Sequence, residues 1–296
     1  MRYIVVDLEW NNAFSPKSKK AINEIIEIGA VKLDENLAIK DTISTFIRPS
    51  VGKKLSKRVV EMTSITDADV ASGMSFINAV KLLKSWIAPD DIVMTWGDTD
   101  IRVLVENCKE FSLGETIPFL GRYLDLQKYC QSKMDGSFNT QQLGLAAAAD
   151  LLGIKDDKFS HHRALDDSLL SVECLKKVFD ENSLKRMVKD CDEVFYRKLN
   201  FRTHYILDIN SPAIEPSALV CICDVCGKQA KQLDDWKISC QAFQGIFKCQ
   251  NCGRKFRKTV RFKQYFDHVA VSEKTYVIIK AKTENKNTKS KVNAAQ

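Results

Sequence analysis

Hydrophobic and polar positions change their spacing several times along this chain, and each change predicts a structural element. An apolar run occupies residues 3–8 and a second occupies residues 92–96, and runs of this length are typical of buried strands. Apolar residues recur every three or four positions at residues 101–105 and again at residues 165–179, which predicts two amphipathic helices. Strands followed by helices indicate an α/β fold for roughly the first 180 residues.

Two acidic residues, Asp7 and Glu9, lie at the end of the first apolar run. Because side chains alternate along a strand, both point to the same face. Two neighbouring carboxylates repel each other, and burying both without a partner costs several kcal/mol, so a bound cation would stabilise this face. Oxygen ligands favour Mg²⁺ or Mn²⁺ over zinc.

Two later segments add further acids. Asp98 and Asp100 follow the second strand at the start of a predicted helix, where ordinary helix capping is the alternative role for both. His162 precedes Asp167, which begins the helix at residues 165–179. A histidine that accepts a proton beside a carboxylate that binds a metal suits phosphodiester hydrolysis.

In order and spacing, these segments resemble the three motifs of the DEDDh 3′→5′ exonuclease family, over roughly residues 1–180. The motifs are Asp7-x-Glu9, then Trp96-Gly97-x-x-Asp100, then His162-x-Ala164-x-x-Asp167-Ser168. The resemblance implies an RNase H-like fold, which is a central mixed sheet with helices on both faces. It also implies two bound Mg²⁺ or Mn²⁺ ions and a histidine that acts as general base. The implied metal ligands are Asp7, Glu9, Asp100 and Asp167, and the implied base is His162. The motif register selects these residues over Asp98, His161 and Asp166.

The same resemblance suggests where the terminal nucleotide would bind. Similar enzymes hold it with the segment after the first helix and with residues that flank the first motif. The corresponding candidates here are Leu8, Trp10, Thr63, Ile65 and Trp96. Ser64 stands where the family usually has glycine, and Trp10 stands where smaller residues are common. Stacking on a base is one role for the two tryptophans, and packing in the core is the alternative.

Paired cysteines mark a second module. Cys223-x-x-Cys226-Gly227 and Cys249-x-x-Cys252-Gly253 are separated by 22 residues, and this pattern resembles a zinc ribbon with one structural Zn²⁺ bound by four thiolates. Disulfides, a redox pair and buried structural cysteines are the alternatives. Ten cysteines without a secretory signal favour a reducing, cytoplasmic setting. The other cysteines are predicted to be small buried residues: Cys221 and Cys240 in this module, and Cys108, Cys130, Cys174 and Cys191 in helices.

Positive charge is concentrated in the same module. The chain has a net charge of +7, but residues 1–214 hold 29 basic and 31 acidic side chains, whereas residues 215–296 hold 16 and 7. Alternation over residues 254–266 places aromatic and aliphatic side chains on one face of a predicted strand and Lys255, Arg257, Arg261 and Lys263 on the other. A basic face suits a nucleic-acid backbone, and a solvated strand face that resists aggregation is the alternative.

The sequence therefore predicts four segments. They are an exonuclease domain at residues 1–180, a helical connector and linker at 181–217, a zinc ribbon at 218–280 and a disordered basic tail at 281–296. The expected function is 3′→5′ hydrolysis of RNA or single-stranded DNA to nucleoside monophosphates. RNA is preferred because the first two motifs resemble the RNA-trimming branch of the family. A catalytically inactive nucleic-acid-binding scaffold and a nuclease of short oligonucleotides are the alternatives. No apolar stretch is long enough to span a membrane.

Overall fold

The computed structural model describes residues 2–134, 142–155 and 162–278. The chain divides into two compact units, Met1–Asn200 and Phe201–Gln296. This boundary splits the predicted connector. Helices α8 (Glu181–Met187) and α9 (Glu193–Asn200) belong to the first unit, because Leu184, Tyr196 and Leu199 are buried in its core. Residues 201–217 belong to the second unit, to whose core they contribute Ile206 and Ile214.

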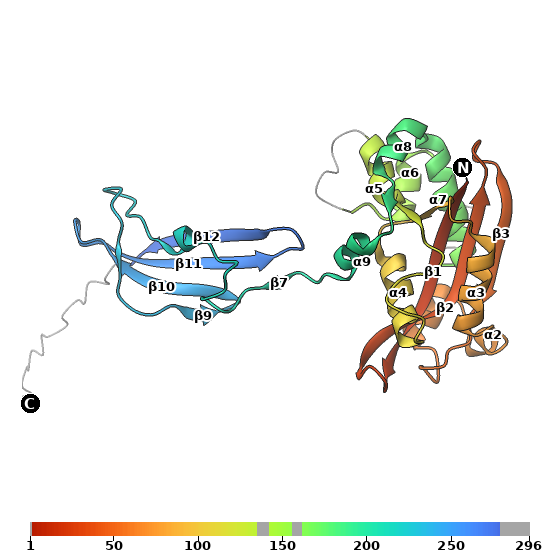
Figure 1. Ribbon diagram of the computed structural model, residues 1–296, viewed down its shortest axis with the longest axis horizontal. Helices are drawn as coiled ribbons and strands as arrows, with labels where there is room; N and C mark the ends of the chain where they lie inside the picture. The colour runs from red at the N-terminus through yellow and green to blue at the C-terminus, as the bar shows by residue number, and fades with distance from the viewer. Residues whose placement is uncertain (1, 135–141, 156–161, 279–296) are drawn as a thin grey trace, which may run out of the picture. The chain divides into compact units, whose positions relative to one another are not determined.

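A mixed six-stranded sheet forms the centre of the first unit (Figure 1). The strand order is β3 (Ile39–Phe46), β2 (Lys20–Leu33), β1 (Tyr3–Ser15), β4 (Ile92–Thr95), β5 (Arg122–Asp125) and β6 (Lys189–Asp190). Strands β1, β4 and β5 are parallel, and the other neighbouring pairs are antiparallel. This arrangement confirms the expected mixed sheet and pairs the start of β1, Tyr3 to Val5, with β4.

Side-chain alternation along β1 divides the core into two clusters. Ile4, Val6 and Leu8 lie in one cluster, which also receives side chains from α3 (Phe76–Trp86), α4 (Thr99–Glu110) and α9. Tyr3 and Val5 lie in the other cluster. The helices of that second cluster are α5 (Leu126–Lys133), α6 (Leu145–Leu151), α7 (Ala164–Val178) and α8. Asp7 and Glu9 continue the alternation of Tyr3 and Val5, so they point toward the side of the sheet that α7 covers.

Two short helices complete the first unit. Helix α1 (Lys57–Thr63) begins at Ser56, whose side chain accepts a hydrogen bond from the backbone N–H of Val59. Helix α2 (Asp67–Ala71) begins with a reciprocal pair of hydrogen bonds between Thr66 and Asp69. A small apolar cluster of Ile26, Leu55, Ile65 and Val70 packs both helices against β2. The chain that carries α1 is therefore held close to the strands that bear the acidic residues.

The second unit is built on an antiparallel sheet. Its three long strands are β10 (Ala242–Lys248), β11 (Lys255–Gln264) and β12 (Val269–Val277). The short elements are β7 (His204–Tyr205), the 3₁₀ helix η1 (Pro216–Leu219), β8 (Lys231–Gln232) and β9 (Lys237–Ser239). The predicted alternation of β11 is confirmed, since Phe256, Val260 and Phe262 are buried while Lys255, Arg257 and Arg261 are exposed.

One charged residue, Lys258, lies among the apolar side chains of β11. It is only 5% exposed. Its ammonium group donates to the carbonyl of Val220 and pairs with Glu273 at 2.7 Å, which compensates for the burial of the charge. Acidic Glu273 is thereby held on the apolar side of the sheet, away from the basic face.

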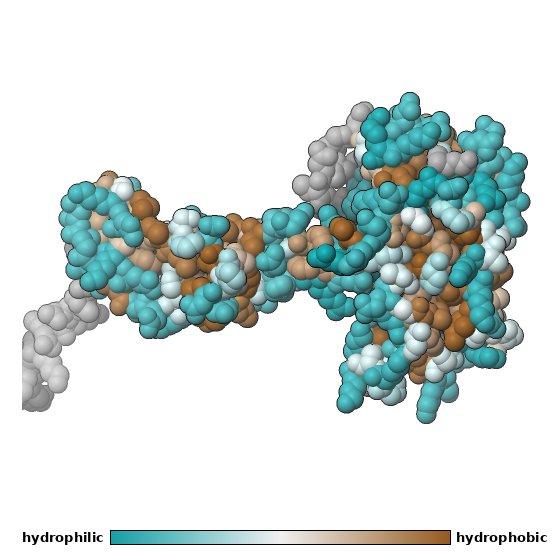
Figure 2. Space-filling model, viewed as in Figure 1, coloured by the Kyte–Doolittle hydropathy of each residue, from teal (hydrophilic) through white to brown (hydrophobic). Residues whose placement is uncertain are grey.

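None of the helices in the described part of the chain is long and apolar enough to cross a membrane. On the face shown in Figure 2, both units carry hydrophobic side chains between hydrophilic ones. The predicted basic tail at residues 281–296 lies outside the described residues.

Candidate functional site

The predicted acidic residues converge in one cleft of the first unit, with a volume of about 1110 Å³. Three segments that are far apart in the sequence form its charged wall, namely β1, the first turn of α4 and the start of α7. All five predicted catalytic and metal-binding residues line it: Asp7, Glu9, Asp100, His162 and Asp167. The cleft therefore brings together the set that the three motifs predict.

An irregularity in strand pairing lies near the middle of β1, at this cleft. Glu9 lies opposite Glu27 on β2, but the next residue, Trp10, lies opposite Ile25. The extra residue is Ile26, whose carbonyl instead accepts a hydrogen bond from the N–H of Ile47 at 2.8 Å. Bulges of this kind redirect the side chains that follow them. Glu9 and Trp10 both line the cleft, although consecutive residues of a regular strand point to opposite faces.

Asp98 and Asp100 have different roles at the start of α4. Asp98 occupies the N-cap position but makes no capping hydrogen bond, and its carboxylate pairs with Arg102 at 2.8 Å. Asp100 is 5% exposed, and its Oδ1 accepts a hydrogen bond from the backbone N–H of Leu8 at 3.2 Å. That bond fixes Asp100 beside Asp7. Only Asp100 lines the cleft, in agreement with the register of the second motif.

The start of α7 packs directly on β2. A side chain at Gly29 would bring its Cβ within 2.1 Å of the carbonyl carbon of Ala164, so only glycine permits this approach. Buried Glu27 accepts a hydrogen bond from the N–H of Ala164 at 3.2 Å, and one of its carboxylate oxygens lies 2.8 Å from the guanidinium of Arg163. Ser168 donates to the carbonyl of Gly29 at 3.2 Å. These contacts fix the first turn of α7, and with it Asp167.

His162 lies immediately before this anchored turn and is exposed to the cleft. Its backbone has φ of 61°, a left-handed conformation that residues other than glycine adopt uncommonly. Metal-ligand atoms of Glu9, His162 and Asp167 lie within 4.8 Å of one another. The imidazole is therefore next to the carboxylates. His161, the alternative considered for this position, lies outside the described residues, and Asp166 does not line the cleft.

The crowded carboxylates hold their protons more strongly than isolated ones. Burial, and then the negative charges of Asp100 and Asp167, raise the pKa of Asp7 well above its ordinary value. Burial, followed by the charge of Asp167, raises the pKa of Glu9 to about 8, and burial raises the pKa of Asp100 to about 7. Such shifts mean that ionising the whole set is costly unless cations are bound. The oxygen-only carboxylate set fits hard divalent cations.

Helices α1 and α6 line the cleft as well. Of the predicted substrate contacts, Leu8, Trp10, Thr63 and Trp96 line it. Ile65 does not, because it is 1% exposed and packs with the small apolar cluster against β2. Trp10 and Trp96 are half-buried, and the indole of Trp96 donates to the carbonyl of Leu143 at 3.0 Å. Both tryptophans pack against the core and also border the cleft, so the two roles considered for them are compatible.

Four functional candidates carry no signal in the three motifs. Arg58, Asn12 and Asn23 line the cleft, and Glu27 anchors α7. Glu27 had a detectable signal, since an acid inside the apolar run of residues 25–31 demands a buried partner. The other three occupy polar segments in which nothing distinguishes them from solvated residues.

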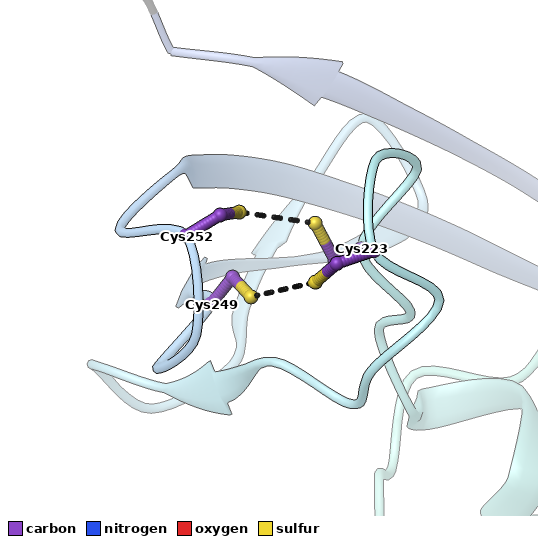
Figure 3. Close-up of side chains that lie close together, drawn as sticks. Cys223, Cys249 and Cys252 are labelled. Carbon is purple, nitrogen blue, oxygen red and sulfur yellow. Dashed lines mark hydrogen bonds between the residues drawn. The ribbon is translucent and has the colours of Figure 1, made fainter.

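The four predicted zinc ligands also come together, in the second unit. Figure 3 shows the sulfur atoms of Cys223, Cys249 and Cys252 turned toward one another from two loops. Cys223 and Cys252 have their sulfurs 3.4 Å apart, as do Cys226 and Cys249, and all four lie within 4.8 Å of one another. Zn–S bonds of about 2.3 Å in a tetrahedron require sulfurs about 3.8 Å apart, so the cluster fits one zinc ion.

Matching turns build the two halves of this cluster. Gly227 and Gly253 have φ of 65° and 74°, and each donates its N–H to the carbonyl of the first cysteine of its pair at 3.0 Å. The N–H of Cys252 and the thiol of Cys226 help to lower the pKa of Cys249 to about 6. A lower pKa favours the thiolate that binds a metal.

The remaining cysteines partly follow the prediction. Cys108, Cys130, Cys174 and Cys221 are buried. Cys240 is exposed, because it lies in the turn between β9 and β10 with φ of 50°. Cys191 is half-buried in the loop before α9 instead of in a helix. None of these residues joins the four-cysteine cluster among the described residues.

Comparison with known proteins identifies relatives of the first unit. A sequence model of the family described as "RNase_T: Exonuclease" matches residues 4–175. The protein "Probable 3′-5′ exonuclease KapD" of Bacillus subtilis (strain 168) is 31% identical over 181 residues, which cover 59% of this chain and 83% of KapD. "DNA polymerase III PolC-type" of Clostridium perfringens (strain 13 / Type A) is 30% identical over 206 residues, covering 67% of this chain but 12% of the polymerase.

Solved structures support the same fold. The structure described as the nuclease domain of 3′hExo, a DEDDh family member, aligns with a TM-score of 0.50 and 22% identity, over 60% of this chain and 90% of that one. A full-length 3′-exonuclease aligns with a TM-score of 0.51 and 20% identity, over 62% of each chain. At this level of identity the likeness establishes the RNase H-like exonuclease fold, in agreement with the order of strands around the cleft.

Proposed function

The chain belongs to the DEDDh, RNase_T-type exonuclease family, and we propose that this 3′–5′ exonuclease removes nucleoside monophosphates from RNA or single-stranded DNA by a two-metal mechanism. One observation carries the proposal. Four acids and a histidine from three distant segments line a single cleft, in the order that the family motifs require.

The metal-binding residues would be Asp7, Glu9, Asp100 and Asp167. Their raised pKa values support this role, because bound cations would relieve the repulsion that opposes ionisation. Two Mg²⁺ or Mn²⁺ ions would supply an acidified water and neutralise charge on the reacting phosphate. The hydrogen bond from Leu8 to Asp100 and the anchored start of α7 would keep the carboxylates in place without the ions.

His162 would accept the proton of the attacking water. The water oxygen forms a bond to phosphorus, the bond from phosphorus to the 3′ oxygen of the preceding nucleotide breaks, and that oxygen takes a proton from solvent. The products are a nucleoside 5′-monophosphate and a chain shortened by one unit. The proximity of His162 to Glu9 and Asp167 supports this assignment, because a general base must reach the water that the metal site holds.

RNA is the proposed preferred substrate. The support is the resemblance of residues 7–10 and of Trp96-Gly97 to the RNA-trimming branch. The hydroxyl of Thr63 is already engaged, since it donates to the carbonyl of Val59 at 2.8 Å and accepts from the N–H of Ile65 at 3.1 Å. Thr63 is also only 2% exposed, so it would shape the wall of the cleft rather than recognise the ribose hydroxyl.

The four-cysteine cluster would bind one structural zinc ion, since four thiolates complete its coordination and leave no position for water. We further propose that the adjacent sheet holds the polynucleotide through the predicted basic residues Lys255, Arg257, Arg261 and Lys263. A depression of about 660 Å³ on this face is lined by Arg257 and Arg261 of β11 and also by Lys274 and Tyr276 of β12. A groove with three cations and an aromatic ring suits single-stranded nucleic acid.

The test of the enzyme is digestion of end-labelled RNA and DNA oligomers with Mg²⁺, Mn²⁺ or no divalent ion. We expect shortening from the 3′ end, faster on RNA, that stops with Asp7→Ala or Asp167→Asn. His162→Ala should lose turnover but retain Mn²⁺ binding, measured by calorimetry. Loss of Mn²⁺ binding together with turnover in His162→Ala would contradict its assignment as the base.

The basic groove is tested separately on long and short substrates. Charge reversal at Arg257 and Arg261 should weaken binding of long oligomers and flatten its dependence on salt, while hydrolysis of a dinucleotide persists. Equal affinity of this variant and the unaltered protein for long oligomers would favour a short-oligonucleotide nuclease. Long oligomers that bind but are never shortened, with every metal tried, would favour the inactive scaffold.

A further inference from the structure

Arg58 is the only lysine or arginine among the described residues that line the acidic cleft. The other charged groups along it are the four carboxylates of the catalytic set. Arg58 is exposed, and it makes no hydrogen bond or ion pair with any residue in the described part of the chain. A guanidinium that borders four carboxylates yet pairs with none of them is available to an external anion.

The backbone that presents Arg58 is fixed to the catalytic strand. Asn11, two residues beyond Glu9 on β1, is 1% exposed. Its Oδ1 accepts a hydrogen bond from the N–H of Ser56 at 2.9 Å, and its Nδ2 donates to the carbonyl of Lys54 at 3.3 Å. These bonds hold the residue that caps α1, and Arg58 is the second residue of that helix.

A second buried side chain fixes the preceding loop. The carboxylate of Glu24, which is 2% exposed, accepts hydrogen bonds from the N–H groups of Ser50, Val51 and Gly52 at 2.6, 2.8 and 2.7 Å. Asp67 accepts another from the N–H of Leu55 at 2.9 Å. The segment before α1 is therefore held at several points along the backbone, so a site formed by Arg58 would be preorganised relative to the carboxylates.

The charges in the cleft indicate what Arg58 would bind. Four ionised carboxylates balance two divalent cations, which leaves Arg58 as the net positive charge of the cleft. In 3′→5′ hydrolysis of the last linkage, every other phosphate of the strand lies on the 5′ side of the scissile one. The volume of about 1110 Å³ exceeds the roughly 300–1,000 Å³ of pockets that enclose a small ligand, which suits a polymeric substrate better than a single small molecule.

We propose that Arg58 is a substrate-binding residue that contacts the phosphodiester immediately 5′ of the scissile linkage. The planar guanidinium can donate two parallel hydrogen bonds to the non-bridging oxygens of a phosphate. This inference rests on the proposed exonuclease function and adds a contact that none of the three motifs contains. The contact favours longer strands over a dinucleotide with no 5′-phosphate, because that dinucleotide has only the scissile phosphate.

The test combines Arg58 variants with an oligomer that carries a neutral methylphosphonate at the linkage 5′ of the scissile one. Hydrogen bonds to charged groups contribute about 1.5–3 kcal/mol, so Arg58→Ala should raise KM on the normal oligomer at least about tenfold. We expect kcat to stay within about threefold, and Arg58→Lys to recover part of the affinity. The methylphosphonate should raise KM in the unaltered protein but add little in Arg58→Ala, because each change removes the same contact.

Lys57→Ala is the matched control, since Lys57 is the exposed neighbour of Arg58 on α1 but does not line the cleft. Melting temperatures of all variants should match that of the unaltered protein, because Arg58 makes no hydrogen bond or ion pair within the part of the chain that the structure describes. Equal effects of Arg58→Ala and Lys57→Ala would overturn the proposal. Full additivity of Arg58→Ala and the methylphosphonate would overturn it too.

Equilibrium binding separates this inference from the proposed function. On the His162→Ala background, which should retain the metal ligands, binding of a labelled oligomer can be followed without cleavage. Arg58→Ala should reduce the slope of log affinity against log salt by about 0.7, the value for one phosphate contact in a single strand. An unchanged slope would refute the Arg58 contact. If the unaltered protein degrades no oligomer with either metal but this slope still falls, the hydrolytic function fails while the phosphate contact stands.

Discussion

Replacement of Asp100 by asparagine should stabilise the metal-free protein at alkaline pH while abolishing its activity. Burial raises the pKa of Asp100 from an ordinary 3.8 to about 7, so between these values the folded state binds more protons than the unfolded state. Stability must therefore fall as the pH rises through this window. The difference of about three pKa units corresponds to about 4 kcal/mol at pH 8. Roughly half of this should be measurable, because the neighbouring carboxylates share the same protons.

Asparagine suits this test because its Oδ1 can still accept the hydrogen bond from Leu8. The assay is urea unfolding at pH 5 and pH 8 after dialysis into metal-free buffer. Asp100→Asn should gain about 2 kcal/mol over the unaltered protein at pH 8 and much less at pH 5. Adding Mn²⁺ should reverse the order, because a ligand at 100 times its Kd stabilises the protein that binds it by about 2.7 kcal/mol.

Asp98→Asn is the control of opposite sign. Burial alone would raise the pKa of Asp98, but the hydrogen bond and charge of Arg102 hold it below its ordinary value. Neutralising Asp98 should therefore give no gain at pH 8. A gain in Asp98→Asn equal to that in Asp100→Asn would refute the reasoning, since it would reflect overall charge instead of the crowded cleft. The reasoning would also be refuted if the stability gained in Asp100→Asn were the same at pH 5 and pH 8.

Metal affinity, the packing of α7 on β2 and the cysteine cluster can each be tested by one experiment. Affinity for Mn²⁺ should rise with pH up to about 8, the pKa of Glu9, because the carboxylate ligands must lose their protons before they bind the metal. A flat profile of affinity in calorimetry across pH 6–9 would show that the carboxylates are not the ligands. Gly29→Ala should cost about 2–4 kcal/mol and most of the activity, because its Cβ would collide with the backbone of Ala164. Gly144→Ala should cost far less stability, because a Cβ there meets nothing within 4 Å and φ is −61°; equal losses in urea unfolding would contradict this. Elemental analysis of freshly purified, reduced protein should find one zinc ion per chain. The zinc should be lost in Cys249→Ser but kept in Cys240→Ser, and zinc retained in Cys249→Ser would contradict the predicted ligand set.

Sequence alone predicted the geometry of the site where it depends on closely spaced residues. The spacing of Asp7 and Glu9 places both on one face of a strand whatever the rest of the chain does. The paired cysteines similarly predict their own turns, because a glycine follows each pair and adopts positive φ. The choice of Asp100 over Asp98 depended on the resemblance to the family motif, and only Asp100 lines the cleft.

The prediction was weaker where a residue's role depends on distant partners. Ile65 was predicted near the substrate from its neighbours in sequence, but packing of α1 and α2 against β2 buries it. The connector predicted at residues 181–217 is divided between the units, because a few of its apolar residues pack in each core. Its many charged residues made these few apolar positions inconspicuous in the sequence. Neither outcome could follow from local patterns, since both depend on which distant surface covers the segment.

The residues proposed to be catalytic are also held in place by partners that are distant in the sequence. β2 contains none of the predicted ligands, yet its Glu27 and Gly29 fix the start of α7, while Asn11 on β1 fixes the start of α1. Both walls of the cleft are thus tied to one antiparallel pair of strands, through buried polar side chains that donate to or accept from the backbone. Backbone contacts of this kind place a segment regardless of its own side chains. The anchored segments can therefore carry exposed residues such as His162 and Arg58, whose side chains border the cleft and are accessible to a substrate.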